Sequence, residues 1–355
     1  MKRGSRIILF ALSFAMMLTI SPNYALASYT DSINALYEDY AVEAIQRFIL
    51  ISGIGTEGAD FSISQPVPVY NDDDEYNKAV FLFQNGNCVG QMMTTYVNSQ
   101  FVSSFVQCDF QAVTEISVQK TPFILISFDE ALWIVTSEAS EVIVGQGCGE
   151  LPMATTDQPE NYENQVLELT PISLPEHTVR PKSASYLLDV PYVENSTSPD
   201  SGKGICWAAA MASIIMYRTG INGITADDLY DTLREYYDSN VYWYPDGSCP
   251  WIERLFSWYN LSYTHKHSGT NFDTVKSIIE YDGRPIYCWI TRTNGAHSVA
   301  ICGFDSGYGY YYYSLVDPNV ENPVWVQVSS SASSNSFTYA SSYGYTYTGW
   351  KCHMY

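Results

Sequence analysis

The chain has 355 residues and a net charge of −21, which is long enough for two domains and strongly acidic. Positions 28–182 carry 22 acidic and 5 basic residues, net −17, whereas positions 183–355 carry 16 acidic and 9 basic residues, net −7. An acidic chain argues against nucleic acid or an anionic lipid surface as the main partner. We therefore expect a soluble monomer that binds no nucleic acid.

Residues 1–27 have the pattern of a signal peptide. Three basic residues, Lys2, Arg3 and Arg6, precede an apolar run over 7–20, and Ala25-Leu26-Ala27 is a typical cleavage sequence. The apolar run is too short to span a membrane comfortably, and no other stretch is longer. The sequence therefore predicts a secreted protein, residues 28–355, with no membrane span after cleavage.

Residues 28–150 predict one helix followed by an antiparallel sheet. An apolar stripe at helical spacing runs over 32–51. Apolar, β-branched runs over 79–84 and 88–96 flank Asn85-Gly86-Asn87, a hairpin turn signal. Further elements are a short helix at 111–119 and strands at 67–70, 100–108, 122–128, 131–136 and 141–144. Because the region contains no histidine, we expect it to assist folding or inhibit rather than catalyse.

Residues 151–185 are rich in Pro, Thr, Glu and Asn and read as a linker open to proteolysis, with Lys182-Ser183 as a plausible cleavage site. Residues 186–355 predict a second domain with helices first and an antiparallel sheet after them. Its expected elements are a strand at 186–192, helices at 207–217, 226–236, 249–259 and 272–281, and strands at 286–291, 297–304 and 310–317, with further strands in the tail. The fold class is therefore α+β.

Cys206 stands where a polar loop meets a run that favours a helix. The run 207–217 is rich in Ala and Met and lacks Gly and Pro. A thiol at a helix N-terminus faces unpaired amide groups and the positive end of the macrodipole, which favour the nucleophilic thiolate. The alternative is a small apolar residue packed at the start of a helix, since buried cysteine is common.

Cysteine hydrolysis also needs an imidazole within reach of the thiol and a group that orients the imidazole. His297 follows a loop of small residues, 294–296, and is expected to begin a strand. Asp317 ends the next strand, so both residues would meet at one edge of the sheet. Taken singly, His297 reads as an ordinary half-buried histidine and Asp317 as part of a turn, with Asn319 as a competing orienting residue.

Three segments in this order resemble one family. They are CWAAAMASIIMY from Cys206, GAHSVAICGFD around His297 and LVDPN around Asp317, after the strand that contains VPY. Over about residues 186–320 the chain resembles the papain-like cysteine peptidases, in particular the secreted bacterial branch with the bacteriocin-leader-processing peptidases and the staphopains. The resemblance implies a papain-like fold, a Cys206–His297–Asp317 triad with Trp207 packed beside the nucleophile, and protein or peptide substrates.

The front region resembles, more weakly, the propeptide of the staphopains. That propeptide is a helix plus a cystatin-like half-barrel that blocks the cleft. The resemblance implies that residues 28–150 are an intramolecular inhibitor, so that the chain is a zymogen activated by cleavage in the linker.

The sequence departs from the family at the oxyanion hole. The family uses a glutamine upstream of the cysteine, but this chain has no Gln between Gln165 and Gln327. Asn195 is the natural substitute, with the backbone amide of Cys206 as the second donor. Its side chain is one methylene shorter, and loss of one such donor costs roughly 100-fold in rate.

Two other functions remain open from the sequence. The same three residues would serve an amidase or acyl transferase that acts on a small molecule or a cell-wall peptide. The other alternative is a non-catalytic binding module on a decayed peptidase fold. The absence of the glutamine favours this alternative.

The remaining candidates suggest neither a metal nor a cofactor. The eight cysteines have no metal-type spacing, although Cys88 and Cys108 lie on adjacent predicted strands and could pair. His265 and His267 form an H-x-H pair for which no third ligand is evident. We expect an enzyme that needs no cofactor.

Overall fold

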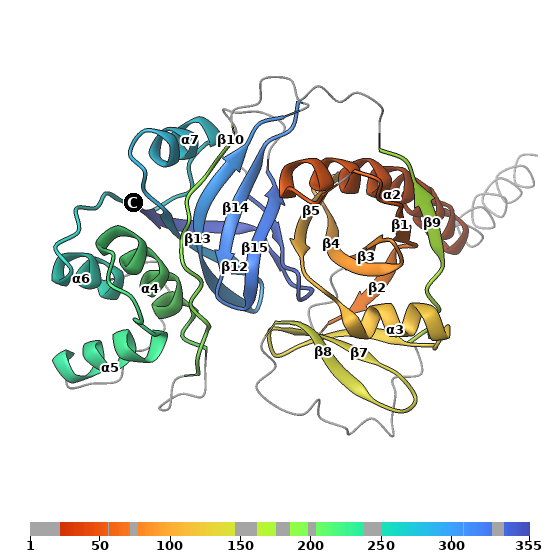
Figure 1. The fold of residues 1–355 in the computed structure, drawn as a ribbon, viewed down its shortest axis with the longest axis horizontal. Helices are drawn as coiled ribbons and strands as arrows, with labels where there is room; N and C mark the ends of the chain where they lie inside the picture. The colour runs from red at the N-terminus through yellow and green to blue at the C-terminus, as the bar shows by residue number, and fades with distance from the viewer. Residues whose placement is uncertain are drawn as a thin grey trace, which may run out of the picture.

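The computed structural model describes residues 22–55, 57–71, 77–145, 162–174, 185–197, 204–237, 250–307, 309–328 and 337–355, with side chains from residue 36 onward. These residues form a mixed α/β fold with one large sheet and six helices (Figure 1). No helix among them has the length and apolar character needed to cross a bilayer.

The front region begins with a helix that is longer than the sequence pattern predicts. Its elements are α2 (Pro22–Ser52), β1 (Phe61–Ser64), β2 (Val67–Tyr70), β3 (Asn77–Gln84), β4 (Asn87–Val97), β5 (Gln100–Gln107), α3 (Gln111–Gln119), β6 (Ile124–Phe128), β7 (Ala131–Val135), β8 (Ser140–Gly145) and β9 (Leu169–Ile172). The start of α2 lies ahead of the expected 32–51 because Ala25, Leu26 and Ala27 are good helix formers. The predicted cleavage point after Ala27 therefore falls within α2.

The back region follows the predicted order of helices and then strands. Its elements are β10 (Ser185–Leu187), α4 (Cys206–Thr219), α5 (Ala226–Tyr237), α6 (Pro250–Trp258), β11 (His265–Lys266), α7 (Phe272–Glu280), β12 (Ile286–Arg292), β13 (Gly295–Asp305), β14 (Tyr312–Asp317), β15 (Val320–Gln327), β16 (Tyr339–Ala340), β17 (Thr346–Tyr347) and β18 (Gly349–Met354). Asn271 caps α7 through its side chain, with Oδ1 accepting from the backbone N–H of Thr274 at 2.9 Å.

Both regions share one 16-stranded sheet, in which β15 of the back region pairs with β5 of the front region. The register places Val324 opposite Val106, Trp325 opposite Phe105 and Val326 opposite Ser104. In Figure 1 the blue strands of the back region stand beside the orange strands of the front region along this line. The two regions are therefore joined by backbone hydrogen bonds and not only by the linker.

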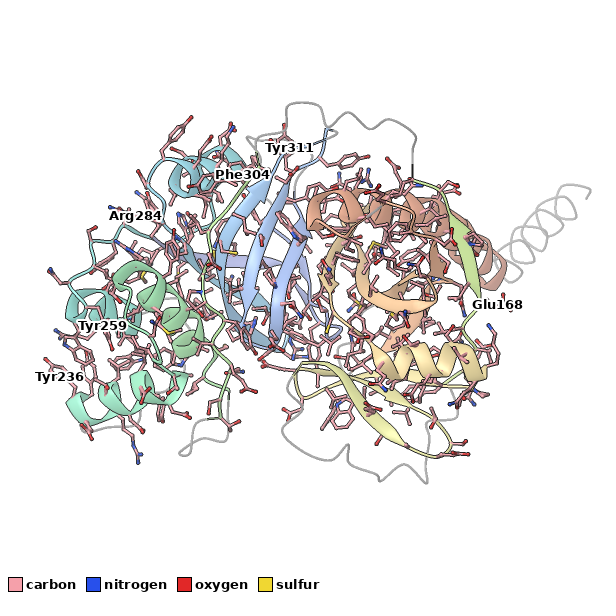
Figure 2. All side chains as sticks on the ribbon, viewed as in Figure 1. Glu168, Tyr236, Tyr259, Arg284, Phe304 and Tyr311 are labelled. Atoms are coloured by element: carbon pink, nitrogen blue, oxygen red, sulfur yellow. The ribbon has the colours of Figure 1, made fainter. Side chains whose placement is uncertain are left out.

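Apolar packing also crosses this boundary. Phe48 of α2 stacks on Phe105 with ring centroids 5.3 Å apart, and it meets Tyr312 of β14 edge-on at 5.5 Å. One core cluster contains Val106 and Val326 from the two paired strands. At the far end of the back sheet, α7 packs its Phe272 against Phe304 and Tyr311, which Figure 2 labels beside that helix.

Four details differ from the sequence-based expectations. The expected strand at 186–192 stops at Leu187, because the Val190 N–H turns back to the carbonyl of Leu188 and Pro191 has no N–H to donate. The front sheet contains one parallel pair, β2 with β6. Within the expected linker, residues 162–174 are ordered, and β9 pairs with β1. Cys88 and Cys108 are both free thiols.

Candidate active site

Cys206 is the first residue of α4, a helix that is buried on every side. The residues from Ala208 to Met216 are all buried, which explains why the segment is apolar around its whole circumference. The residue that precedes Cys206, Ile205, is the N-cap and makes no side-chain hydrogen bond to the first turn. The first amide groups of the helix are therefore left without a side-chain cap, beside a half-buried thiol.

His297 and Asp317 come together from neighbouring strands. His297 is the third residue of β13, two residues inside the strand that it was expected to begin, and Asp317 is the last residue of β14. The two strands are antiparallel, with Ala300 opposite Val316. His297 Nε2 lies 2.8 Å from Asp317 Oδ1, and both side chains are 0% exposed.

Asp317 is surrounded by hydrogen-bond donors. Besides the imidazole, its Oδ1 accepts the backbone N–H of Asn319 at 2.9 Å. Its Oδ2 accepts the Tyr339 hydroxyl at 2.6 Å and the Tyr343 hydroxyl at 3.5 Å. Burial alone would raise the pKa of Asp317, but the charge of His297 and these hydrogen bonds hold it below its usual value. The carboxylate is therefore held in its charged form.

His297 is coupled on its other side to Cys206. Burial alone would lower the pKa of His297, but the charges of Asp317 and Cys206, together with the hydrogen bond to Asp317, hold it well above its usual value. Nε2 is engaged by Asp317, whereas the buried Nδ1 makes no hydrogen bond to any described residue and is the ring nitrogen available to a thiol. The structure thus joins His297 to Asp317 by a hydrogen bond, and the charge of Cys206 acts on the same imidazole.

The tyrosines of the C-terminal tail complete this side of the site. Tyr339 and Tyr347 come from the short β16–β17 hairpin, and the ring of Tyr347 lies 5.6 Å from that of His297. This hairpin rests on the front region: Asn77 Nδ2 donates to the carbonyl of Gly344 at 2.6 Å, and Gln91 Nε2 donates to that of Ser342 at 3.0 Å. The front region therefore supports the residues that hold Asp317.

Gly344 shows how tightly the hairpin fits against the front region. Its φ is +97°, and a Cβ added there would lie 2.8 Å from side-chain atoms of Val69 and Ser127. A larger residue at this position would push the hairpin away from the front region.

Asn195 lies close to the nucleophile segment, but its amide is directed elsewhere. Its Nδ2 is near Gly204, two residues before Cys206, since a Cβ at Gly204 would be 3.0 Å from it. The same Nδ2 donates to Asn319 Oδ1 at 2.9 Å and to Glu130 Oε2 of the front region at 3.4 Å. Both amide hydrogens of Asn195 are thus engaged while the front region is in place.

Asn319 does not compete with Asp317 for the imidazole. Only its backbone N–H contacts Asp317, while its side-chain Nδ2 donates to Glu130 Oε2 at 2.9 Å. Asn319 therefore holds Asp317 through its backbone and contacts Asn195 and Glu130 through its side chain.

Four of the remaining cysteines have surroundings that disfavour the thiolate. Burial raises the pKa of Cys302 to about 11, and it also raises the pKa of Cys88, Cys288 and the half-buried Cys108. Cys148 and Cys249 lie outside the described residues. Among the described cysteines, Cys206 is the one that couples to a histidine.

The histidine pair on β11 makes other contacts. His265 Nδ1 lies 2.6 Å from Glu253 Oε1, and the rings of His265 and His267 are 4.2 Å apart. No group of three His, Cys, Asp or Glu residues in the described part of the chain is arranged to hold a metal ion. This end of the molecule carries the aromatic side chains labelled Tyr236 and Tyr259 in Figure 2.

Sequence reasoning missed two residues of the site, Glu130 and Tyr339. Tyr339 lies in the tail, for which the sequence predicts only further strands. Glu130 stands in a tight turn, Asp129-Glu130, between two strands, where Asn-Gly would be usual. An acidic pair at such a turn was the available signal.

Comparison with known protein families gives a match in the back region. Residues 187–346 match the sequence model of the Peptidase_C39 like family, a span that contains Asn195, Cys206, His297, Asp317 and Tyr339. The match supports a cysteine-peptidase-like domain over these residues. The comparison with curated proteins gave no match.

Proposed function

We propose that residues 186–355 are a papain-like cysteine peptidase and that the whole chain is its secreted zymogen. The observation that carries the proposal is the buried His297, which is bound to Asp317 through Nε2 at 2.8 Å, keeps Nδ1 without a hydrogen bond to the described residues and has a pKa raised by the charges of Asp317 and Cys206. An imidazole held between a carboxylate and a thiol is the arrangement that thiol hydrolysis requires.

The chemistry follows from these positions. Cys206 Sγ, as a thiolate beside the His297 imidazolium, attacks the carbonyl carbon of the substrate and forms a C–S bond. The Asn195 amide and the Cys206 backbone N–H stabilise the oxyanion. His297 then gives its proton to the departing amine, the C–N bond breaks and a thioester remains. Neutral His297 next takes a proton from water, which attacks the thioester, and the acid and the thiol are released.

Asp317 keeps the imidazole in position and favours its protonated form, so the thiolate–imidazolium pair persists at neutral pH. The front region serves as the intramolecular inhibitor. In support, its Glu130 binds the side-chain amides of Asn195 and Asn319, and Asn195 is the proposed oxyanion donor. Activation then requires this region to move, after a cut in the linker.

The test compares the full chain with its Cys206→Ala variant. The wild-type protein should cut itself in the linker on incubation and then release new peptide termini from a casein digest, while Cys206→Ala should do neither. Iodoacetamide should label Cys206 faster than the other cysteines of the native chain, and a Cys352→Ala variant serves as the control. Equal labelling of all cysteines would contradict the proposal, and acyl transfer without new peptide termini would identify a transferase.

A further inference from the structure

The tip of the β6–β7 hairpin has an unusual combination of residue type and backbone conformation. Phe128 pairs with Ala131, so Asp129 and Glu130 form a two-residue turn with φ of 51° and 57°. Turns of this kind favour glycine at the second position, and a left-handed conformation costs an L-residue roughly 1–2 kcal/mol. Glu130 thus occupies a position that glycine would fill with less strain, which indicates that its side chain has a use.

The Glu130 carboxylate is held by two side-chain amides of the back region. Its Oε2 accepts Asn319 Nδ2 at 2.9 Å and Asn195 Nδ2 at 3.4 Å. The two amides are fixed to each other, since Asn195 Nδ2 also donates to Asn319 Oδ1 at 2.9 Å. The Asn195 backbone N–H donates to the carbonyl of Pro318 at 2.9 Å. Two preorganised donors therefore converge on one carboxylate oxygen.

The position of the amides connects them to the proposed chemistry. Asn319 is two residues after Asp317 and holds it through its backbone N–H. Asn195 lies against Gly204, two residues before Cys206. Hydrogen bonds to a charged acceptor are stronger than those between neutral groups, so a carboxylate is the ligand that suits this pair of donors.

We propose that the Asn319 amide, held in place by Asn195, is a carboxylate-binding subsite that Glu130 fills while the front region is in place and that an acidic side chain of a peptide substrate fills after the front region has moved. The Asn195 hydrogen that Glu130 accepts is then released for the oxyanion. The second half of this inference rests on the proposed function. Because His297 protonates the departing amine and Asn319 lies on its Asp317 side, the acidic side chain belongs to the leaving-group part of the substrate. Glu130 is then an internal substitute for that side chain.

The first test measures carboxylate binding by thermal unfolding of the full chain, in a Cys206→Ala background that prevents self-cleavage. Glu130→Ala keeps a Cβ at the left-handed position but removes the carboxylate, and we expect Tm to fall by about 2–4 °C. Added propionate should restore part of this loss, whereas propionamide at the same concentration should not. Glu130→Gly should also lower Tm, although glycine relieves the strain of the turn.

Asp129→Ala is the matched control, because Asp129 is exposed in the same turn and also has a positive φ. Its Tm should not respond to propionate, and adding Asn319→Ala to Glu130→Ala should abolish the response. Equal effects of Glu130→Ala and Asp129→Ala, an increase in Tm with Glu130→Gly, or equal effects of propionate and propionamide would each overturn the subsite. This test does not depend on a reactive thiol.

The second test uses the chain after self-cleavage and two peptides that differ only in Glu or Gln directly after the scissile bond. We expect kcat/KM to be roughly 10-fold higher for the Glu peptide, the ratio that about 1.4 kcal/mol gives. Asn319→Ala should bring the ratio close to one. Equal hydrolysis of both peptides by the wild-type chain would overturn the substrate half, while hydrolysis of neither would count against the proposed function and leave the Tm result to decide the subsite.

Discussion

The two sides of His297 are built in different ways. On the Asp317 side, every group comes from the back region, the side chains are fully buried, and the carboxylate accepts four hydrogen bonds. On the Asn195 side, Asn195 and Glu130 are half-buried, Asn319 is buried, and a carboxylate from the front region accepts hydrogen bonds from two amides. Under the proposed function, the difference teaches that the His297–Asp317 pair is assembled before activation, while the amides that would meet substrate are occupied by another part of the same chain.

Removal of the Asp317 charge should have the largest effect on peptide hydrolysis. Asp317→Asn keeps the shape of the side chain but not its charge, so the pKa of His297 should fall and the thiolate–imidazolium pair should weaken. We expect hydrolysis to slow by at least about 100-fold. The initial rate of peptide hydrolysis checks this, with Asp227→Asn on the exposed face of α5 as the control. Wild-type activity in Asp317→Asn would show that hydrolysis does not need the Asp317 charge.

Replacement of Asn195 should affect hydrolysis and thiol alkylation differently. Hydrolysis passes through an oxyanion, whereas alkylation of a thiol by iodoacetamide does not. Asn195→Ala should therefore slow hydrolysis by about 100-fold and leave the alkylation of Cys206 much less affected. Asn195→Gln, which supplies the longer amide of the related peptidases, should retain more hydrolysis than Asn195→Ala. Equal losses in hydrolysis and alkylation would show that Asn195 supports the thiol and the imidazole and not the oxyanion.

Replacement of Tyr339, which donates a hydrogen bond to Asp317, should have a smaller effect than Asp317→Asn. Tyr339→Phe removes the 2.6 Å hydrogen bond to Asp317, so the free energy of unfolding should fall by about 1.5–3 kcal/mol. The less neutralised carboxylate should raise the pKa of His297 further and move the alkaline limit of peptide hydrolysis, which needs the imidazolium proton, to higher pH. Tyr343→Phe, whose hydroxyl is 3.5 Å from the same oxygen, is the matched control with a weaker effect. Denaturant unfolding and a pH series of hydrolysis rates measure both.

The free energy of unfolding should depend on pH through His297 and Asp317, and this is the smallest of the expected effects. The pKa of His297 is raised on folding, so its contribution is complete below the ordinary value of 6.5 and is lost as pH rises through the folded value. The pKa of Asp317 is lowered, so its contribution is present above 3.8 and is lost as pH falls through the folded value. Denaturant unfolding across pH should show both losses for the wild type and a flatter profile for Asp317→Asn. Identical profiles would contradict this account.

The parts of the site that follow from local pattern were predictable from the sequence. α4 was predicted because residues 207–217 are rich in Ala and Met and lack Gly and Pro, and its start at Cys206 follows from the preceding loop. The contact between His297 and Asp317 was predictable because two adjacent antiparallel strands place those positions at one edge. Asn195 was found by its position before Cys206, although its hydrogen bonds were not.

The parts that depend on contacts between distant segments were not predictable. Glu130 and Asn319 are 189 positions apart, and no periodic pattern links a turn in one region to a loop in another. Tyr339 meets Asp317 only because the tail hairpin is clamped by side chains of the front region such as Asn77 and Gln91. The pairing of β15 with β5 is likewise a property of the assembled chain, since either strand could have ended a separate sheet.

That pairing has a consequence for how the chain would be switched on. A cut in the linker leaves the backbone bonds between β5 and β15, and the packing of Phe48 on Phe105 and Tyr312, in place. The cut turns an internal contact into an association between two molecules, which weakens as the protein is diluted. A nicked sample should therefore gain activity per molecule on dilution, so that the concentration of the protein itself acts as part of the switch.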